Sequence, residues 1–182
     1  MSLILVTDVF GVTSALLEIS KKLGANSIVD PYSGQMMEFK DEANAYSYFV
    51  NEIGADNYLL HLLKAVKSIN QQTTLIGFSV GATAIWRLSE IECNSFINQA
   101  YCFYGSQIRN FTKIEPRFKI NLVFPKSEPH FDVAELQSNI AEKDNVKTKK
   151  VEYLHGFMNY YSNNYSKYGY MEHIEFLCSI SS

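Results

Sequence analysis

The chain is 182 residues long, which fits one domain with a sizeable hydrophobic core. Hydrophobic residues make up 47% of it, and the 12 Tyr and 12 Phe exclude a disordered chain. With 16 Lys and Arg against 19 Asp and Glu, the net charge of -3 favours neither nucleic acid nor an anionic membrane as a partner. We interpret the one short basic cluster, Lys147, Lys149 and Lys150, as a solvent-exposed approach to a strand.

The cysteines and histidines indicate no metal site. Cys93, Cys102 and Cys178 are widely spaced and form no CxxC pair, so we interpret them as small buried residues rather than as a disulfide framework. The four histidines lack metal-ligand spacing and no glycine-rich phosphate loop is present, so no cofactor is predicted. The first residues carry no basic region, and their apolar run is too short for a signal peptide or a membrane span. We therefore expect a cytoplasmic protein.

In chain order, six short apolar runs predict β-strands. They are Leu3–Thr7, Ser27–Asp30, Thr74–Phe78, Ala100–Tyr104, Ile120–Phe124 and Val151–Leu154. Several of these runs are almost continuously apolar, which is typical of parallel strands that are covered on both faces.

Amphipathic segments separate these runs. Apolar residues recur at helical spacing in Val12–Leu23, Tyr46–Ile53, Leu59–Ile69, Ala84–Ile91, Val133–Ile140 and Tyr170–Cys178. The segment Gly105–Lys119 has no clear period and is predicted to be a loop with a short helical turn. The alternation predicts a single α/β domain over residues 1–182, with a mainly parallel, doubly wound sheet and helices on both faces. Its active site is expected at the carboxyl ends of the strands.

One predicted strand ends in Gly77-x-Ser79-x-Gly81, a nucleophile-elbow pattern that opens a helix. A sharp strand-to-helix turn exposes the serine hydroxyl, and it requires very small residues two positions away on either side. It also directs backbone amides toward the place where an oxyanion would form. We predict that Ser79 is a nucleophile.

A serine nucleophile needs a base, and His155 is the best placed histidine because it directly follows a predicted strand. His130 is its competitor, since it also lies in a loop after a strand. His61 and His173 lie within predicted helices, where structural roles suffice.

The base must be oriented by a carboxylate, and the loop after Phe124 offers Glu128 and Asp132. Asp132 directly precedes a predicted helix and has Glu135 three residues further on, as in a helix N-cap. Glu128 has no such local role. We therefore favour Glu128 as the acid, with Asp132 as the second choice.

A second oxyanion donor is expected from the loop after the first strand, Thr7–Val12. Gly11 would let this loop turn close to the site. We predict that the amide of Val9 or Phe10 acts together with that of Val80.

With these residues in place, the chain resembles the dienelactone hydrolase family of α/β-hydrolases from Val6 to about Tyr165. The matching segments are Thr7–Val12, Val29–Tyr32, Phe103–Gly105 and, most specifically, His155–Asn159. The resemblance implies a compact α/β-hydrolase fold with Ser79 as nucleophile, Glu128 as acid and His155 as base.

The chain also departs from that family. Dienelactone hydrolases proper use Cys where this chain has Ser79, and their acid is usually Asp where it has Glu128. The chain lacks the leading strands of full-length members, so we expect a fold that is shortened at its N-terminus. No insertion is long enough for a lid. None of Arg87, Arg109 and Arg117 clearly matches the arginines that hold a substrate carboxylate, so dienelactone is not the expected substrate.

We therefore expect a small serine hydrolase of esters, thioesters or lactones that is a monomer or homodimer. Its open substrate pocket would involve Phe10, Tyr32, Tyr104 and Phe157, although these aromatic residues could equally belong to the core. One alternative is a degenerate hydrolase scaffold used for binding or assembly, favoured by the shortened N-terminus, the glutamate acid and the tyrosine-rich tail. Another is a flavodoxin-like cofactor binder, which leaves Ser79 and His155 unexplained.

Overall fold

The computed structural model describes residues 2–92 and 94–181. In this part of the chain, six strands form one fully parallel sheet in the order β2-β1-β3-β4-β5-β6. The strands are β1 (Ser2–Val6), β2 (Ser27–Val29), β3 (Thr73–Phe78), β4 (Ile97–Phe103), β5 (Lys119–Phe124) and β6 (Val146–Lys150). The predicted doubly wound α/β fold is confirmed.

The strand order reverses at β1. The chain passes from β1 outward to β2 at one edge, and then returns to place β3 on the other side of β1. The loops that leave β1 and β3 therefore diverge, and in sheets of this kind a binding crevice is expected between them at the carboxyl ends of these strands. The predicted oxyanion loop and the predicted nucleophile follow these two strands.

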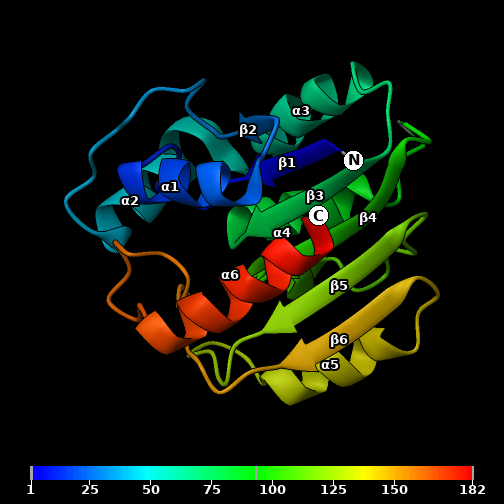
Figure 1. Cartoon of the computed structure of the whole chain (residues 1–182). Coiled ribbons are helices and arrows are strands. Elements are labelled where there is room, and N and C mark those ends of the chain that lie inside the picture. Colours follow the sequence, from blue (N-terminus) through cyan, green and yellow to red (C-terminus); the bar gives the residue numbers. More distant parts are fainter. Residues whose placement is uncertain (1, 93, 182) are drawn as a thin grey trace.

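Helices cover both faces of the sheet (Figure 1). On one face lie α1 (Ser14–Leu23) and α6 (Lys167–Ser181). The other face is covered by α2 (Glu42–Tyr48), α3 (Gly54–Lys67), α4 (Val80–Leu88) and α5 (Val133–Ala141). A π-helical turn, η1 (Phe49–Ile53), joins α2 to α3, and a 3-10 helix, η2 (Ser106–Asn110), follows β4. The predicted helical turn after β4 is thus present.

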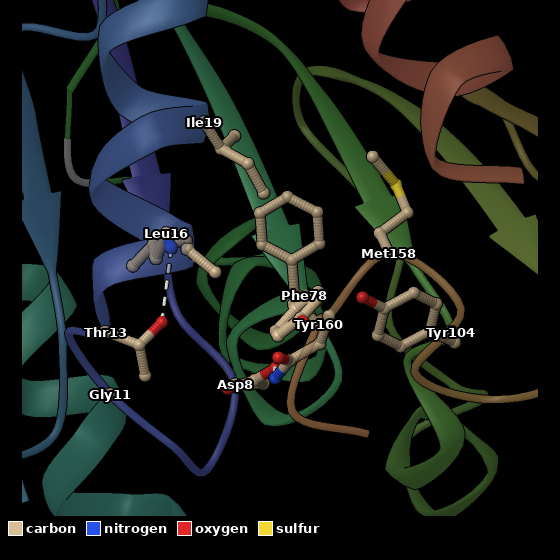
Figure 2. Close-up of a pocket in the computed structure, with 11 residues that line it drawn as sticks. Asp8, Gly11, Thr13, Leu16, Ile19, Phe78, Tyr104, Met158 and Tyr160 are labelled. Carbon is tan, nitrogen blue, oxygen red and sulfur yellow. Dashed lines mark hydrogen bonds between the residues drawn. The ribbon is translucent and has the colours of Figure 1, made fainter. Parts of the chain in front are cut away.

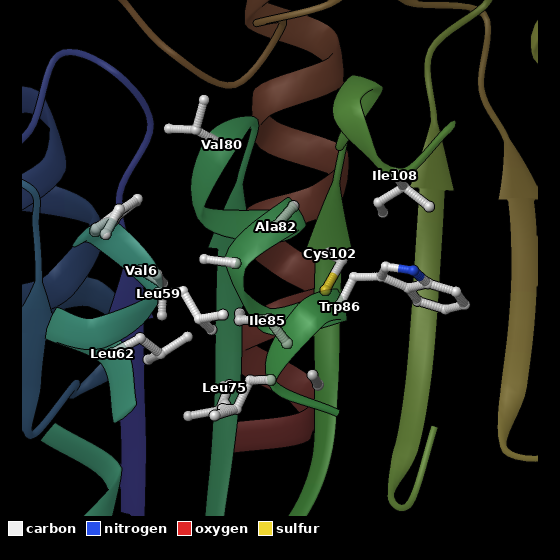
Figure 3. Packing of buried hydrophobic residues seen from close by; sticks show 14 of the residues in the cluster. Val6, Leu59, Leu62, Leu75, Val80, Ala82, Ile85, Trp86, Cys102 and Ile108 are labelled. Atoms are coloured by element: carbon white, nitrogen blue, oxygen red, sulfur yellow. The ribbon is translucent and has the colours of Figure 1, made fainter. Parts of the chain in front are cut away.

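The core has two parts because side chains alternate between the two faces of each strand. On β1, Leu3 and Leu5 pack toward α1 and α6, whereas Ile4 and Val6 pack toward the helices of the other face. Figure 3 shows the second part, in which side chains of β1 and β3 meet those of α3 and α4. Trp86 is fully buried there, and its indole nitrogen donates to the carbonyl of Phe111 at 2.9 Å. This packing fixes α4 and the turn before it.

The last strand lies earlier than predicted. We expected a strand at Val151–Leu154, but β6 spans Val146–Lys150 and contains the lysines interpreted as its approach. β6 is an edge strand that is poorly covered, so its side chains are largely exposed rather than continuously apolar. Exposed lysines at a sheet edge oppose pairing with another chain. The apolar run that follows leads out of the sheet to His155.

The cysteines are only partly as expected. Cys102 is buried in the core, and burial raises the pKa of its thiol. Cys178 is partly exposed on α6, and Cys93 lies outside the described residues. Among the helices of residues 2–92 and 94–181, none has the length and apolar character needed to cross a membrane.

Candidate active site

Ser79 lies in the sharp turn between β3 and α4, with a φ of 52° and a ψ of -114°. A positive φ is unusual for a residue other than glycine, and such strain persists only where surrounding packing holds it. The glycines of the motif permit that packing. A Cβ at Gly81 would lie 2.4 Å from the carbonyl oxygens of Val6 and Thr7, and one at Gly77 would lie 2.9 Å from the backbone of Ala82. The turn therefore has the crowded geometry that the motif predicts.

The structure brings Ser79, His155 and Glu128 together from three separate loops. Ser79 Oγ lies 3.0 Å from His155 Nε2, and His155 Nδ1 lies 2.8 Å from Glu128 Oε1. The Glu128 side chain is 8% exposed and that of His155 is 22% exposed. This arrangement forms a continuous chain of hydrogen bonds from hydroxyl to imidazole to carboxylate.

The surroundings of Glu128 keep it ionised. Burial alone would raise the pKa of Glu128, but hydrogen bonds from His155 and Ser106 and the charges of His155 and Arg109 outweigh it, so the pKa lies below its usual value. Ser106 Oγ donates to Glu128 Oε1 and also lies 2.9 Å from His155 Nδ1. Arg109 donates from Nη1 to the carbonyl of Ser106 at 2.8 Å. The helix η2 thus supports the carboxylate.

The two competing residues lie elsewhere. Asp132 is the N-cap of α5, and its carboxylate accepts from the amides of Ala134 at 2.7 Å and Glu135 at 3.3 Å. His130 is exposed in the loop before α5. The structure therefore places Glu128 rather than Asp132 beside His155, the candidate base.

Two backbone amides are available near Ser79. Val9 and Val80 line the same cavity as Ser79, and among the described residues neither amide has a hydrogen-bond partner. Phe10 differs, because its amide donates to Asp8 Oδ1 at 2.9 Å. Of the two donors predicted in the loop after β1, the amide of Val9 is therefore available to a substrate, whereas that of Phe10 is already used in a hydrogen bond.

Tyr32 supports the loop that carries Val9. We expected Tyr32 in the substrate pocket, but it is buried and its hydroxyl donates to the carbonyl of Val9 at 2.6 Å. Gly11, with a φ of 67°, packs against its ring. Tyr58 adds a second anchor, since its hydroxyl donates to the carbonyl of Thr7 at 2.9 Å. These contacts fix the backbone on either side of the candidate oxyanion donor.

The other three aromatic residues predicted at the substrate pocket, Phe10, Tyr104 and Phe157, are also buried in the core. Tyr104 is 1% exposed and Phe157 is fully buried, with their ring centres 5.5 Å apart. The ring centre of Tyr104 lies 5.0 Å from that of His155, so it packs behind the imidazole. Tyr104 directly follows β4 and has a φ of 43°, so the chain turns there, and the tyrosine belongs to the core on the side of α1 and α6.

A cavity of about 190 Å³ opens beside Ser79. Besides the residues named above, it is lined by side chains that we did not predict from the sequence: Glu42, Ala43, Tyr46, Ser106 and Gln107. Ser106 carried a usable signal, because it comes two residues after a predicted strand end. The others come from α2 and η2, whose approach to the site depends on long-range packing. In the described chain, no group of three or more His, Cys, Asp or Glu side chains is placed to hold a metal ion.

A much smaller cavity of about 20 Å³ lies between the loop after β1, α1 and the segment after His155 (Figure 2). Asp8 lies at this cavity, and its Oδ2 accepts from Asn159 Nδ2 at 2.6 Å. Burial raises the pKa of Asp8 to about 6, against hydrogen bonds from Phe10 and Asn159 that lower it. The Asp8–Asn159 bond ties the candidate oxyanion loop to the loop that carries His155.

Comparisons with known proteins bear on the fold. No protein-family model matches the sequence. The chain is 28% identical over 164 residues to the uncharacterised protein YczH of Bacillus subtilis strain 168. The aligned region covers 86% of this chain and 80% of that protein.

Among solved structures, a dienelactone hydrolase-like promiscuous phosphotriesterase from metagenomic libraries superposes with a TM-score of 0.68 at 12% identity. The match covers 99% of this chain and 84% of that one. The chain has the α/β-hydrolase fold. Est1E from Butyrivibrio proteoclasticus matches with a TM-score of 0.61 at 8% identity, covering 98% of this chain and 85% of that one. A lipase-esterase related protein from Clostridium acetobutylicum ATCC 824 matches with a TM-score of 0.62 at 12% identity, and the match covers 97% of this chain and 93% of that one. The predicted resemblance to dienelactone hydrolases is thus confirmed at the level of the fold.

Proposed function

We propose that the protein is a serine hydrolase that cleaves an ester, thioester or lactone through an acyl-enzyme. The observation that carries this proposal is the hydrogen-bonded chain from Ser79 to His155 to Glu128, which starts at a strained turn. Val9 and Val80 contribute two amides without partners among the described residues to the same cavity.

Each group has a defined step in this mechanism. His155 Nε2 takes the proton of Ser79 as Oγ attacks the carbonyl carbon, and the carbonyl electron pair moves onto its oxygen. The amides of Val9 and Val80 stabilise that oxyanion, an effect on the order of 3 kcal/mol for each donor. The oxyanion then collapses, the bond to the leaving oxygen or sulfur breaks, and His155 gives its proton to the leaving group.

The second half repeats these steps with water. His155 takes a proton from water, the resulting hydroxide attacks the acyl-Ser79 ester, and the proton returns to Ser79 as the acid departs. Glu128 stays ionised throughout, holds the imidazole in one tautomer and stabilises its cation. The lowered pKa of Glu128 suits that role.

The structural neighbours support a hydrolase. Their names describe a promiscuous phosphotriesterase and a lipase-esterase related protein. The choice of carboxylic esters, thioesters or lactones for this chain rests on its own residues. Ser79 and His155 share a cavity with Val9 and Val80, whose amides have no hydrogen-bond partner among the described residues and would stabilise an oxyanion formed at Ser79. A degenerate binding scaffold predicts a broken contact between Ser79 and His155, and the 3.0 Å separation supports the hydrolase instead.

The test is hydrolysis of p-nitrophenyl acetate, a short thioester and a small lactone by purified protein. We expect turnover of at least one of them, and loss of that turnover in Ser79→Ala. Ser138→Ala, which changes an exposed serine on α5, is the matched control and should retain full activity. Equal activity of Ser79→Ala and the control would overturn the proposal.

A further inference from the structure

A second cavity of about 260 Å³ adjoins the one beside Ser79. The two cavities share Tyr46, Val80 and Gln107 in their walls. Gln107 Nε2 lies 3.4 Å from the hydroxyl of Tyr46, so side chains of α2 and η2 meet where the cavities join. Both cavities are bordered by this solvent-exposed contact and by Val80, so a substrate group at Ser79 that passes the pair would enter the second cavity.

The second cavity is mainly apolar. Its walls include Phe49 and Val50 of η1, Ala55 of α3, Ala84 of α4 and Phe111 after η2. The π-helical turn supplies two of these residues, and π-helical turns are frequent at functional sites. Mainly apolar walls favour an apolar occupant.

The cation in this wall is already engaged. Arg87 Nη2 pairs with Asp56 Oδ1 at 2.7 Å, and the guanidinium lies 4.7 Å from the ring centre of Phe111. Arg87 Nη1 has no hydrogen-bond partner among the described residues, but it is buried, so a group in the cavity cannot reach it without a rearrangement. An uncharged chain therefore fits this cavity better than one that ends in a carboxylate.

The cavity lies on the acyl side of the site. In the proposed mechanism His155 gives its proton to the leaving group, so the leaving group must lie next to the imidazole. No residue of the segment 151–166 lines the second cavity, whereas Val80, a candidate oxyanion donor, does. The acyl part of the ester is the part that can extend away from His155 and past Val80.

We propose that this cavity binds the uncharged, apolar acyl chain of the substrate, an inference that rests on the proposed serine hydrolase function. An apolar cavity of ~150 Å³ can hold a benzene molecule. The larger cavity here fits an acyl chain on the order of six to ten carbon atoms, or an arylalkanoyl group.

The experiment measures kcat/KM for p-nitrophenyl acetate, butyrate, hexanoate and octanoate with wild-type protein, Ala55→Trp and Leu60→Trp. Wild type should gain roughly three- to fourfold for each added methylene until the cavity is full. Ala55 is exposed but lines the cavity, so Ala55→Trp places a large ring at the cavity mouth and should lower the octanoate-to-acetate ratio at least tenfold. Leu60→Trp changes an exposed residue of the same helix that does not line the cavity, and should keep the wild-type ratio.

Two further substrate series decide which part of the substrate binds there. Acetates of ethanol, hexanol and octanol vary the leaving group, and a chain-length gain that Ala55→Trp abolishes in this series would overturn the acyl assignment. Preference for p-nitrophenyl hydrogen adipate over p-nitrophenyl hexanoate would show a site for a carboxylate and would also overturn it.

A fluorophosphonate probe separates failure of this inference from failure of the proposed function. Suppose that Ser79 is labelled and acetate is hydrolysed, but kcat/KM does not depend on acyl chain length, or Ala55→Trp leaves the octanoate-to-acetate ratio unchanged. The acyl-chain inference then fails, and the proposed hydrolase function stands. If the folded protein neither reacts with the probe nor hydrolyses any ester, both fail.

Discussion

Glu128 and Asp8 are two carboxylates at the carboxyl ends of the strands, after β5 and β1, but their surroundings shift their pKa values in opposite directions. At Glu128, hydrogen bonds from His155 and Ser106 and nearby positive charge outweigh burial, and the pKa falls. At Asp8, burial outweighs the hydrogen bonds from Phe10 and Asn159, and the pKa rises to about 6. The surrounding groups and the degree of burial, rather than the residue type, therefore decide whether the pKa of each carboxyl group is lowered or raised.

The two loops are correspondingly built for different tasks. The loop after β5 presents Glu128 to the imidazole, with the η2 helix behind it. The loop after β1 presents the amide of Val9, and Asp8 anchors that loop to Asn159. We therefore expect Glu128 to govern the chemical step and Asp8 to govern loop geometry and stability.

The largest effect is expected for Glu128→Gln, which should lower kcat by about 10²- to 10⁴-fold. The neutral amide can donate to Nδ1 of His155 and so favours the tautomer that cannot accept the proton of Ser79. Steady-state kinetics at pH 7 measure this loss. If Glu128→Gln lowers kcat no more than Asp8→Asn does, the proposed difference between the two loops is wrong.

Asp8→Asn should lower kcat/KM by about tenfold or less, because the amide retains one acceptor for the two hydrogen bonds that hold the loop. Its clearer effect is on the pH dependence of stability. The folded chain binds a proton at Asp8 more tightly than the unfolded chain, whose pKa is near 3.8. This contribution to stability is present below about pH 4 and is lost as the pH rises to about 6.

Urea unfolding of wild type and Asp8→Asn between pH 4 and 7 tests this. The free energy of unfolding of wild type, relative to that of the variant, should fall as the pH rises from about 4 to about 6 and then stay level. A difference that grows with pH would mean that the Asp8 carboxylate is stabilised in the folded protein, as Glu128 is.

Ser106→Ala should lower kcat roughly two- to tenfold, the effect of one hydrogen bond to the Glu128 carboxylate, and leave KM nearly unchanged. Ser106→Thr retains a hydroxyl and should recover most of the rate. If Thr fails to rescue kcat while both variants keep wild-type thermal stability, Ser106 does not act through its hydroxyl.

The smallest effect is expected for Asp132→Ala. Loss of the N-cap of α5 should lower the free energy of unfolding by about 1 kcal/mol and leave kcat/KM unchanged. Thermal denaturation and ester hydrolysis give the two readouts. A large loss of activity without a loss of stability would instead assign Asp132 to catalysis.

The parts of the site that the sequence predicted are those with local causes. The Ser79 turn follows from two glycines that a strand-to-helix crossing requires, and Asp132 was separated from Glu128 by its capping position. The parallel sheet followed from short apolar runs alternating with amphipathic segments.

The parts that were missed depend on contacts between distant segments. Tyr46 and Gln107 reach the cavity only because α2 and η2 pack near α4. Tyr104 directly follows β4 and Phe157 lies two residues after His155, positions where substrate-binding residues are often found, but both side chains are buried in the core. The position of β6 was missed because an exposed edge strand contains lysines where a central strand contains valine or isoleucine.

The most direct test of the account is labelling of folded protein with a fluorophosphonate probe, followed by peptide mass spectrometry, on wild type and His155→Ala. The account predicts one covalent adduct, on Ser79, that forms in wild type and is lost without His155, because the imidazole must take the hydroxyl proton. No adduct on well-folded wild type, or an adduct on Ser79 that persists in His155→Ala, would contradict an activated serine at this site.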